Sequence, residues 1–314
     1  MSTPEVVSIG NMLVEVMRAR LEEPLNQPGV FVGPFPSGDT CIYVDAVARL
    51  GHAAGFIGAV GADDFGRCLL DRFARDGVDA SAVQVLPDYA TGVAFVAYFT
   101  DGSRKFLYHW RQAAAGQLAP EHVRPEYLAR TKWLHVTGCN LAVNASCREA
   151  CYRALECLPP GALVSFDPNI RPEVLSVEEI RDLCWPVLER AEVVFPSCGE
   201  AMMFTGAASD EEGCRQWAAQ GKLVVLKQGP GGCRLFHGAE ALSVPGFTVE
   251  EVDPTGAGDT FCGAFTVARL EGMGLAEAAR FANAAGALAV TKQGPMEGAP
   301  TRAELEALLA QPAE

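Results

Sequence analysis

Short, almost entirely apolar segments that alternate with longer amphipathic ones constrain the fold of this chain most. The apolar segments, read as strands, lie at 6–9, 54–60, 133–137, 163–166, 193–195 and 223–226. The amphipathic segments, read as helices, lie at 39–50, 65–76, 145–158 and 177–190. Pro186 is expected to bend or split the last of these helices. Strands that are apolar on both faces and separated by helices predict an α/β protein of three layers, with a mostly parallel sheet covered on both sides.

Two stretches break this alternation because they are rich in β-forming residues throughout. They lie at 12–32 and 91–110, and the second is apolar on both faces around Phe95. We predict a small second sheet, a lid formed by about residues 11–36 and 91–112, within a single domain that spans residues 1–314. A lid that exposes apolar side chains needs a partner surface, so a homodimer through the lid is expected.

Charge and cysteine content argue against several classes of function. The 314 residues carry a formal net charge of -14, which disfavours nucleic acids and anionic membranes as partners. The 11 cysteines include no Cys-x-x-Cys pair and are expected to be reduced, as in a cytoplasmic protein. We expect no secretory leader, and no apolar run reaches the roughly 18 residues of a membrane span.

The run 252–261 gives the strongest indication of chemistry. Its small residues Gly256, Ala257 and Gly258 precede an Ala-rich segment with helical character. Such a helix start offers unpaired N–H groups and a positive dipole end to an anion such as phosphate. Asp259 follows at once, and because like charges repel, we interpret it as the base that takes a proton from an attacking hydroxyl. This run alone leaves an alternative open, in which the glycines serve helix packing and Asp259 complements the dipole.

Polar residues follow the predicted strand that ends at Phe166, at the edge where ligands bind in parallel sheets. Asp167 and Asn169 are suited to hold a hydrated cation, and Arg171 to clamp a phosphate or sugar oxygen. The same residues would also suit an Asx turn followed by a surface arginine.

Two further strand exits carry similar groups. Glu200 is suited to orient a magnesium-bound water, or is simply an acid in the first turn of a helix. Lys227 is suited to meet phosphate or ribose, and Gly229 and Gly232 let the backbone approach a nucleotide. The glycines would equally suit a hairpin turn before the apolar segment 233–236.

Anion donors, cation ligands and a proton acceptor are thus predicted to converge on one edge of one sheet. Together they supply what phosphoryl transfer requires, namely positioning, charge neutralisation and a base for the nucleophile. The chain has no Gly-x-x-x-x-Gly-Lys-[Ser/Thr] motif, so the helix start itself is predicted to hold the phosphate.

The run 253–265, Asp-Pro-Thr-Gly-Ala-Gly-Asp-Thr-Phe-Cys-Gly-Ala-Phe, resembles the signature of the ribokinase (PfkB) family of carbohydrate kinases. The runs 61–66 and 167–171 support the resemblance, which extends over the whole chain. It implies a ribokinase-like α/β/α sandwich with a β lid, and a requirement for ATP and Mg²⁺. A monovalent cation such as K⁺ activates many members.

The resemblance also implies roles for individual residues. Asp259 is then the catalytic base, and the backbone from Gly256 to Gly258 forms the anion hole. Asn283 falls where the family meets adenine, although a helix-surface asparagine is the alternative. Asp253 and Thr255 fall near the monovalent cation site, where backbone carbonyls provide most of the ligands.

Departures from the family pattern concern mainly the sugar end. Glu15 stands where the family has an Asp that binds sugar hydroxyls, and Ile42 replaces a sugar-binding Asn. The Gly-Gly hinge reads Ser37-Gly38-Asp39. At the phosphate end Ser197 replaces an Asn, while Glu200 is kept. The sequence therefore defines the phosphoryl-transfer chemistry better than it defines the identity of the sugar.

The prediction is an ATP-dependent kinase that phosphorylates a primary hydroxyl of a small sugar held by Glu15, Gly38 and Asp39. Segments of the chain resemble 2-keto-3-deoxygluconate kinases and tagatose-type kinases. The predicted substrates are therefore a ketohexose, tagatose or fructose, or the keto-sugar acid 2-keto-3-deoxygluconate. Arg111 lies near the position where the acid-sugar kinases bind a carboxylate, and an arginine on the lid surface is the alternative.

Two other functions remain open from the sequence. A nucleoside kinase of the same fold would need an aromatic slot for the base, which Phe31, Phe35 or Trp110 could form. A catalytically silent sugar sensor would have no need of the intact run from Gly256 to Asp259.

Overall fold

The large sheet forms the centre of the protein, whose computed structural model describes residues 3–170 and 175–311. Its strands, in spatial order, are β13 (Glu240–Val244), β12 (Cys233–His237), β11 (Leu223–Lys227), β10 (Val193–Val194), β9 (Leu163–Asp167), β8 (Trp133–Thr137), β1 (Val6–Ile9), β4 (Ala54–Gly61) and β5 (Asp79–Leu86). Strands β12 and β13 are antiparallel to their neighbours, and the other strand pairs are parallel. The mostly parallel sheet that the sequence predicts is therefore confirmed.

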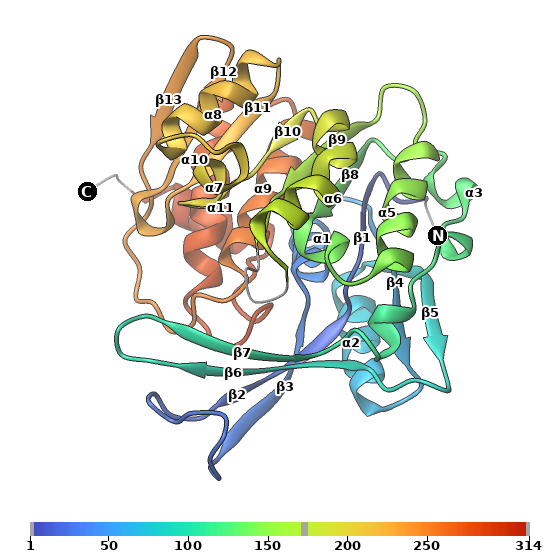
Figure 1. Ribbon diagram of the computed structural model, residues 1–314. Helices are drawn as coiled ribbons and strands as arrows, with labels where there is room; N and C mark the ends of the chain where they lie inside the picture. Colours follow the sequence, from blue (N-terminus) through green and yellow to red (C-terminus); the bar gives the residue numbers. More distant parts are fainter. Residues whose placement is uncertain (1–2, 171–174, 312–314) are drawn as a thin grey trace.

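Helices cover both faces of this sheet (Figure 1). One layer contains α1 (Asp39–Arg49), α2 (Asp64–Asp76), α9 (Ala257–Leu270), α10 (Leu275–Ala289) and α11 (Arg302–Leu309). The other contains α5 (Ala145–Glu156), α6 (Val177–Arg190), α7 (Glu200–Thr205) and α8 (Asp210–Ala219), while α3 (Pro125–Leu128) and α4 (Gly138–Leu141) are short. Neighbouring strand residues alternate between two buried clusters, so Val6 packs on one layer and Val7 on the other. Among the described residues, no helix has the length and apolar character to cross a membrane.

A second, four-stranded sheet lies beside this body (Figure 1, bottom). Its order is β3 (Phe31–Ser37), β2 (Leu13–Arg18), β6 (Gly92–Tyr98) and β7 (Arg104–His109). Strands β2 and β6 run parallel although they are far apart in the sequence, and β3 and β7 flank them in antiparallel orientation. Residues from two distant segments therefore share one face of this sheet.

The structure corrects three details of the predicted elements. Helix α6 runs through Pro186 as one element, so of the two expected effects, a bend or a split, the split does not occur. Residues 79–86 form an unpredicted edge strand, β5, because their half-buried, partly polar pattern lacks the apolar signature of the central strands. Strand β10 contains two residues rather than the three predicted.

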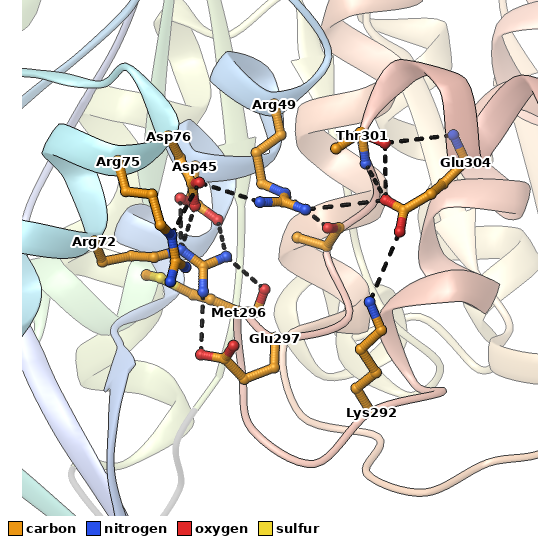
Figure 2. Close-up of polar contacts among 11 residues, drawn as sticks. Asp45, Arg49, Arg72, Arg75, Asp76, Lys292, Met296, Glu297, Thr301 and Glu304 are labelled. Carbon is orange, nitrogen blue, oxygen red and sulfur yellow. Dashed lines mark hydrogen bonds and ion pairs between the residues drawn. The ribbon is translucent and has the colours of Figure 1, made fainter.

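A buried ionic cluster ties the C-terminal part of the chain to the first two helices of its layer (Figure 2). Arg72 on α2 donates to both carboxylate oxygens of Asp45 on α1, at 3.2 and 2.8 Å. It also pairs with Asp76 and Glu297 and donates to the carbonyl of Met296 at 2.7 Å. Burial raises the pKa of Asp45 to about 7, although Arg72 opposes the shift. The cluster fixes the loop that contains residues 294–297.

Candidate active site

Helix α9 begins at Gly256, which has φ of 80° and therefore lies in the left-handed region that favours glycine. A Cβ at this position would collide with the carbonyl oxygen of Pro295. A Cβ at Gly258 would lie 3.5 Å from Nζ of Lys227, so the first turn of α9 faces that ammonium group. The glycines therefore leave a cradle between the helix start and a cation, which suits an anion.

A cavity of 620 Å³, called the main cavity here because the predicted site residues line it, lies in front of this cradle. Its lining contains most of the predicted catalytic and sugar-binding residues and two of the three predicted for the metal site, without Asp253. These lining residues are Glu15, Gly38, Asp39, Asn169, Glu200, Lys227, Thr255, Gly256, Gly258 and Asp259. The strand exits and the helix start that the sequence indicated thus meet around one cavity. Asp259 lies on the cavity wall and is partly exposed, as a base for a bound hydroxyl must be.

A second cavity, of 400 Å³, lies on the other side of the cradle. Predicted nucleotide-site residues contribute to its lining: Lys227, Gly229, Gly232, Ala257, Gly258 and Asn283. Lys227, Pro254 and Gly258 line both cavities, so the two meet at the cradle. This arrangement can hold two molecules whose reacting ends face each other beside Asp259.

Asn283 is buried on α10 rather than exposed on a helix surface. Its side-chain amide donates to the carbonyl oxygens of Val244 and Pro245, at 3.1 and 3.0 Å. These bonds fix the chain just after β13, where it leads into Phe247 on the cavity wall. The amide therefore shapes the second cavity.

The Asp39 carboxylate is fully engaged by protein donors, which the sequence did not predict. One oxygen accepts from the N–H of Thr40 at 2.8 Å and from Asn140 at 3.2 Å. The other accepts from Thr137 at 2.6 Å and from Asn169 at 2.7 Å. Since a carboxylate has about four lone-pair positions, Asp39 orders the amides of Asn140 and Asn169, and its contact with a sugar stays a prediction.

Glu15 contrasts with Asp39 because it has a free acceptor. It is buried in the small sheet, and its Oε2 accepts from Ser37 at 3.3 Å. Its Oε1 has no hydrogen-bond partner within the part of the chain that the structure describes. Burial, reinforced by the charge of Asp253, raises the pKa of Glu15 to about 8. Glu15 therefore offers the main cavity a buried polar atom that still lacks a partner.

Acidic residues and one lysine surround the phosphate end of the main cavity. Glu200 is buried, and its two oxygens accept from the backbone of Ile170 at 2.8 Å and of Ser197 at 2.7 Å. Burial and the nearby Asp167 raise the pKa of Glu200. Asp167 pairs with Lys227. Burial would lower the pKa of Lys227, but the charges led by Asp167 outweigh burial and raise it, so the lysine remains a cation.

Asp253 and Thr255 precede the cradle and already have protein partners. The buried Asp253 carboxylate accepts from the N–H groups of Thr255 and Gly294, at 3.0 and 2.9 Å. Tyr98 of the small sheet donates to Asp253 at 3.0 Å and bonds the hydroxyl of Thr255 at 2.7 Å. A cation bound here would therefore rely on backbone carbonyls, as the resemblance to the family implied.

Two predicted residues do not join this group. Arg111 is exposed, donates to the carbonyl of Ala142 at 3.3 Å and is not among the residues that line the main cavity. Its geometry here matches the alternative interpretation, a surface arginine. Arg171 lies outside the described residues.

Several contributors to the site were not predicted from the sequence. Asn11, Arg104 and Cys139 line the main cavity, and Thr137 and Asn140 support Asp39. Position at a strand's carboxyl end could have indicated both residues, because Thr137 is the last residue of β8 and Asn140 follows it as Asn169 follows β9. No local pattern marks Arg104, which depends on how the small sheet folds over the body.

The pfkB family carbohydrate kinase model matches residues 3–302. Fructokinase-1 of Zea mays is 34% identical over 319 residues, covering 97% of this chain and 97% of that protein. A provisionally assigned ribokinase II from E. coli, solved in complex with ATP and Mg²⁺, has a TM-score of 0.92 and 39% identity, with 98% and 99% of the two chains covered. Fructokinase from Vibrio cholerae O395, bound to fructose, ADP and calcium, has a TM-score of 0.81 and 28% identity, with 98% and 100% covered. With two cavities joined at a helix start that carries the family signature, this chain belongs to the pfkB family of carbohydrate kinases.

Proposed function

We propose that this carbohydrate kinase transfers the γ-phosphate of ATP to a primary hydroxyl of fructose. The observation that carries the proposal is the meeting of the two cavities at Lys227, Pro254 and Gly258, directly beside Asp259. The fructokinase from Zea mays and the fructose-bound structure from Vibrio cholerae support fructose as the acceptor. The ATP complex of the E. coli relative supports ATP as the donor.

The proposed roles follow from the geometry. Asp259 accepts the proton of the attacking hydroxyl, and the N–H groups at the start of α9 stabilise the charge on the transferred phosphoryl group. Lys227 neutralises further charge on the phosphates from the opposite side of the cradle. Asn283 and the glycines of the second cavity shape the space for the nucleotide base.

The donor set fits Mg²⁺ bound to the nucleotide rather than a metal held by protein alone. In the described part of the chain, no three His, Cys, Asp or Glu residues are placed to hold a metal ion. Mg²⁺ keeps several waters and commonly binds through phosphates and one or two carboxylates. Asp167, Asn169 and Glu200 are the residues proposed to hold those waters, and the ion would neutralise charge on the phosphates when bound.

The electrostatics of the sugar end favour a neutral ketohexose over a sugar acid. Glu15 is buried there, and its raised pKa shows that burial and Asp253 outweigh the attraction of Arg104. A substrate carboxylate beside Glu15 would meet the same burial and the same Asp253 charge, both of which disfavour a negative charge at this end. Fructose is therefore the preferred acceptor, tagatose is the second ketohexose, and 2-keto-3-deoxygluconate is disfavoured.

One observation favours a nucleoside as a second candidate acceptor. Phe106, Tyr108 and Trp110 line the main cavity in a row. Their rings stack, with centroids 5.4 Å apart for the first pair and 4.5 Å for the second. Parallel rings in such a row present their edges, which can pack edge to face against a nucleobase or against the apolar face of a sugar.

A panel of acceptors tests the proposal. ADP release with ATP and Mg²⁺ is measured for fructose, tagatose, 2-keto-3-deoxygluconate, ribose and a ribonucleoside, and ³¹P NMR identifies the product. We expect the highest kcat/KM with fructose and a value at least about tenfold lower with the sugar acid. The burial and the Asp253 charge that raise the pKa of Glu15 should cost a substrate carboxylate more than about 1.4 kcal/mol. A higher kcat/KM with the sugar acid or the nucleoside would contradict the assignment.

We further propose that the small sheet, with residues 11–36 and 91–112, acts as a lid that excludes water during transfer. Its exposed side chains Val30, Phe31 and Leu107 support association of two copies through this sheet. A monovalent cation requirement stays a prediction about the carbonyls near Asp253.

Glu15→Gln should change how stability depends on pH. The folded-state pKa of about 8 exceeds the ordinary value of 4.5, so the folded protein binds this proton more tightly. The contribution of Glu15 to the free energy of unfolding is therefore complete below pH 4.5 and is lost as the pH rises to about 8. Between these pH values we expect the free energy of unfolding to fall further in the parent than in the variant, by on the order of a few kcal/mol.

Urea unfolding of the sugar-free protein at several pH values measures this difference. The Asp45 carboxyl also titrates with a raised pKa, but it is common to both proteins and cancels in the comparison. Parallel stability profiles for the parent and Glu15→Gln would show that Glu15 is ionised at neutral pH.

A further inference from the structure

Tyr98, the last residue of β6, connects the small sheet to the loop that precedes the anion cradle. Its hydroxyl donates to Asp253 at 3.0 Å and bonds the hydroxyl of Thr255 at 2.7 Å. Burial, reinforced by the charges of Glu15 and Asp253, raises the pKa of Tyr98, so the hydroxyl keeps its proton. A side chain of the small sheet thus holds the two residues that flank Pro254, directly before Gly256.

Asp253 links Tyr98 to the cradle through the hydrogen bonds that its carboxylate accepts. Its carboxylate is 3% exposed, and buried carboxylates need donors. Two of those donors are the N–H groups of Thr255 and Gly294. The next residue, Pro295, presents its carbonyl oxygen against Gly256 so closely that no Cβ would fit between them. A shift of Asp253 would therefore move the support on which Gly256 rests.

The same sheet forms the wall of the sugar end. Glu15 on β2 pairs in register with Ala94 on β6, and both residues line the main cavity. Ala94 and Tyr98 point to the same face of the strand, because they are four residues apart. A sugar that contacts this wall restricts the strand that ends in Tyr98.

We propose that Tyr98 is a positioning residue, which makes the alignment of the cradle depend on a sugar being seated against the small sheet. Tyr98 is not among the described residues that line either cavity, so it acts through Asp253 and Thr255 and not on the reacting atoms. The inference rests on the proposed function, because it requires a sugar acceptor.

Tyr98→Phe tests the proposal, because it removes the hydroxyl and keeps the ring. We expect kcat for sugar phosphorylation to fall about tenfold or more, with an unchanged KM for ATP. ATP hydrolysis without sugar should stay at the parent rate, because no sugar then engages the small sheet. The ratio of sugar-free hydrolysis to sugar phosphorylation therefore rises. A merely structural defect would lower the amount of active enzyme and leave this ratio unchanged.

Both rates are measured by ADP release with the best acceptor of the panel, so the parent's activity tests the proposed function separately. Tyr127→Phe is the matched control, since its hydroxyl donates to the carbonyl of Asp79 at 2.9 Å, and its ratio should equal that of the parent. Thr255→Val removes one of the two contacts and should raise the ratio as well. The double variant should have the same ratio as Tyr98→Phe alone, because that change already removes both contacts of the hydroxyl. An unchanged ratio in Tyr98→Phe, or additive effects in the double variant, would overturn the proposal.

Discussion

Replacing Asp259 by Asn is expected to lower sugar phosphorylation by roughly 10²-fold or more while ATP still binds. The change removes the proton acceptor on the wall of the main cavity but preserves the size of the side chain. The cradle is formed by backbone groups of α9, so the nucleotide keeps its contacts there. Steady-state kinetics with fructose give the turnover, and a thermal shift with an ATP analogue reports binding.

Glu179→Gln provides the matched control for this experiment. Glu179 is also an acid in the first turn of a helix, α6, and it is exposed. If Asp259 only complemented the helix dipole, both variants would change stability slightly and neither would change turnover. Parental turnover in Asp259→Asn would refute the assignment of the base.

Replacing Arg72 by Met is expected to destabilise the fold by about 3–5 kcal/mol, because it leaves a buried carboxylate without its cation. The side chains of Arg72 and Asp45 are 2% and 0% exposed, and their N–O distance is 2.8 Å. The variant also loses the bond to the carbonyl of Met296, so the loop at Glu297 loosens (Figure 2). Urea-induced unfolding monitored by circular dichroism measures the loss.

Two variants check the cause of this effect. Arg75→Met removes a pair with Asp76 from a side chain that is 61% exposed, and it should change stability by no more than about 0.5 kcal/mol. Combining Arg72→Met with Asp45→Leu removes both buried charges and should recover part of the lost stability. A double variant less stable than Arg72→Met would show that the unpaired carboxylate is not the source of the loss.

The layers of the fold could be predicted because the central strands are apolar on both faces. Val6 and Val7 pack into different buried clusters, and a strand with two apolar faces needs a helical layer on each side to keep both from water. The phosphate end was similarly accessible, because Gly256, Gly258 and Asp259 lie within one continuous run. Of its two glycines, Gly256 is required by its close contact with Pro295. A site can be predicted from local sequence when the residues that form it are neighbours in the chain.

The sugar end was harder because its contacts join distant segments. Asp39 stands where a sugar ligand was expected, but side chains from the last residue of β8 and from the segments after β8 and β9 bond its oxygens. The partnership of Tyr98 with Asp253 spans 155 positions and two sheets. No periodicity or motif within either segment reveals such a pairing.

The two cavities share Lys227, Pro254 and Gly258 but differ in the rest of their lining. Residues within 227–290 line the second cavity, whereas the small-sheet wall of the main cavity comes from residues before 111. Under the proposed function, the wall that faces the acceptor is therefore encoded largely apart from the residues around the nucleotide. Substitutions on that wall that leave the contact of Tyr98 with Asp253 intact are expected to change which alcohol is accepted more than they change nucleotide binding.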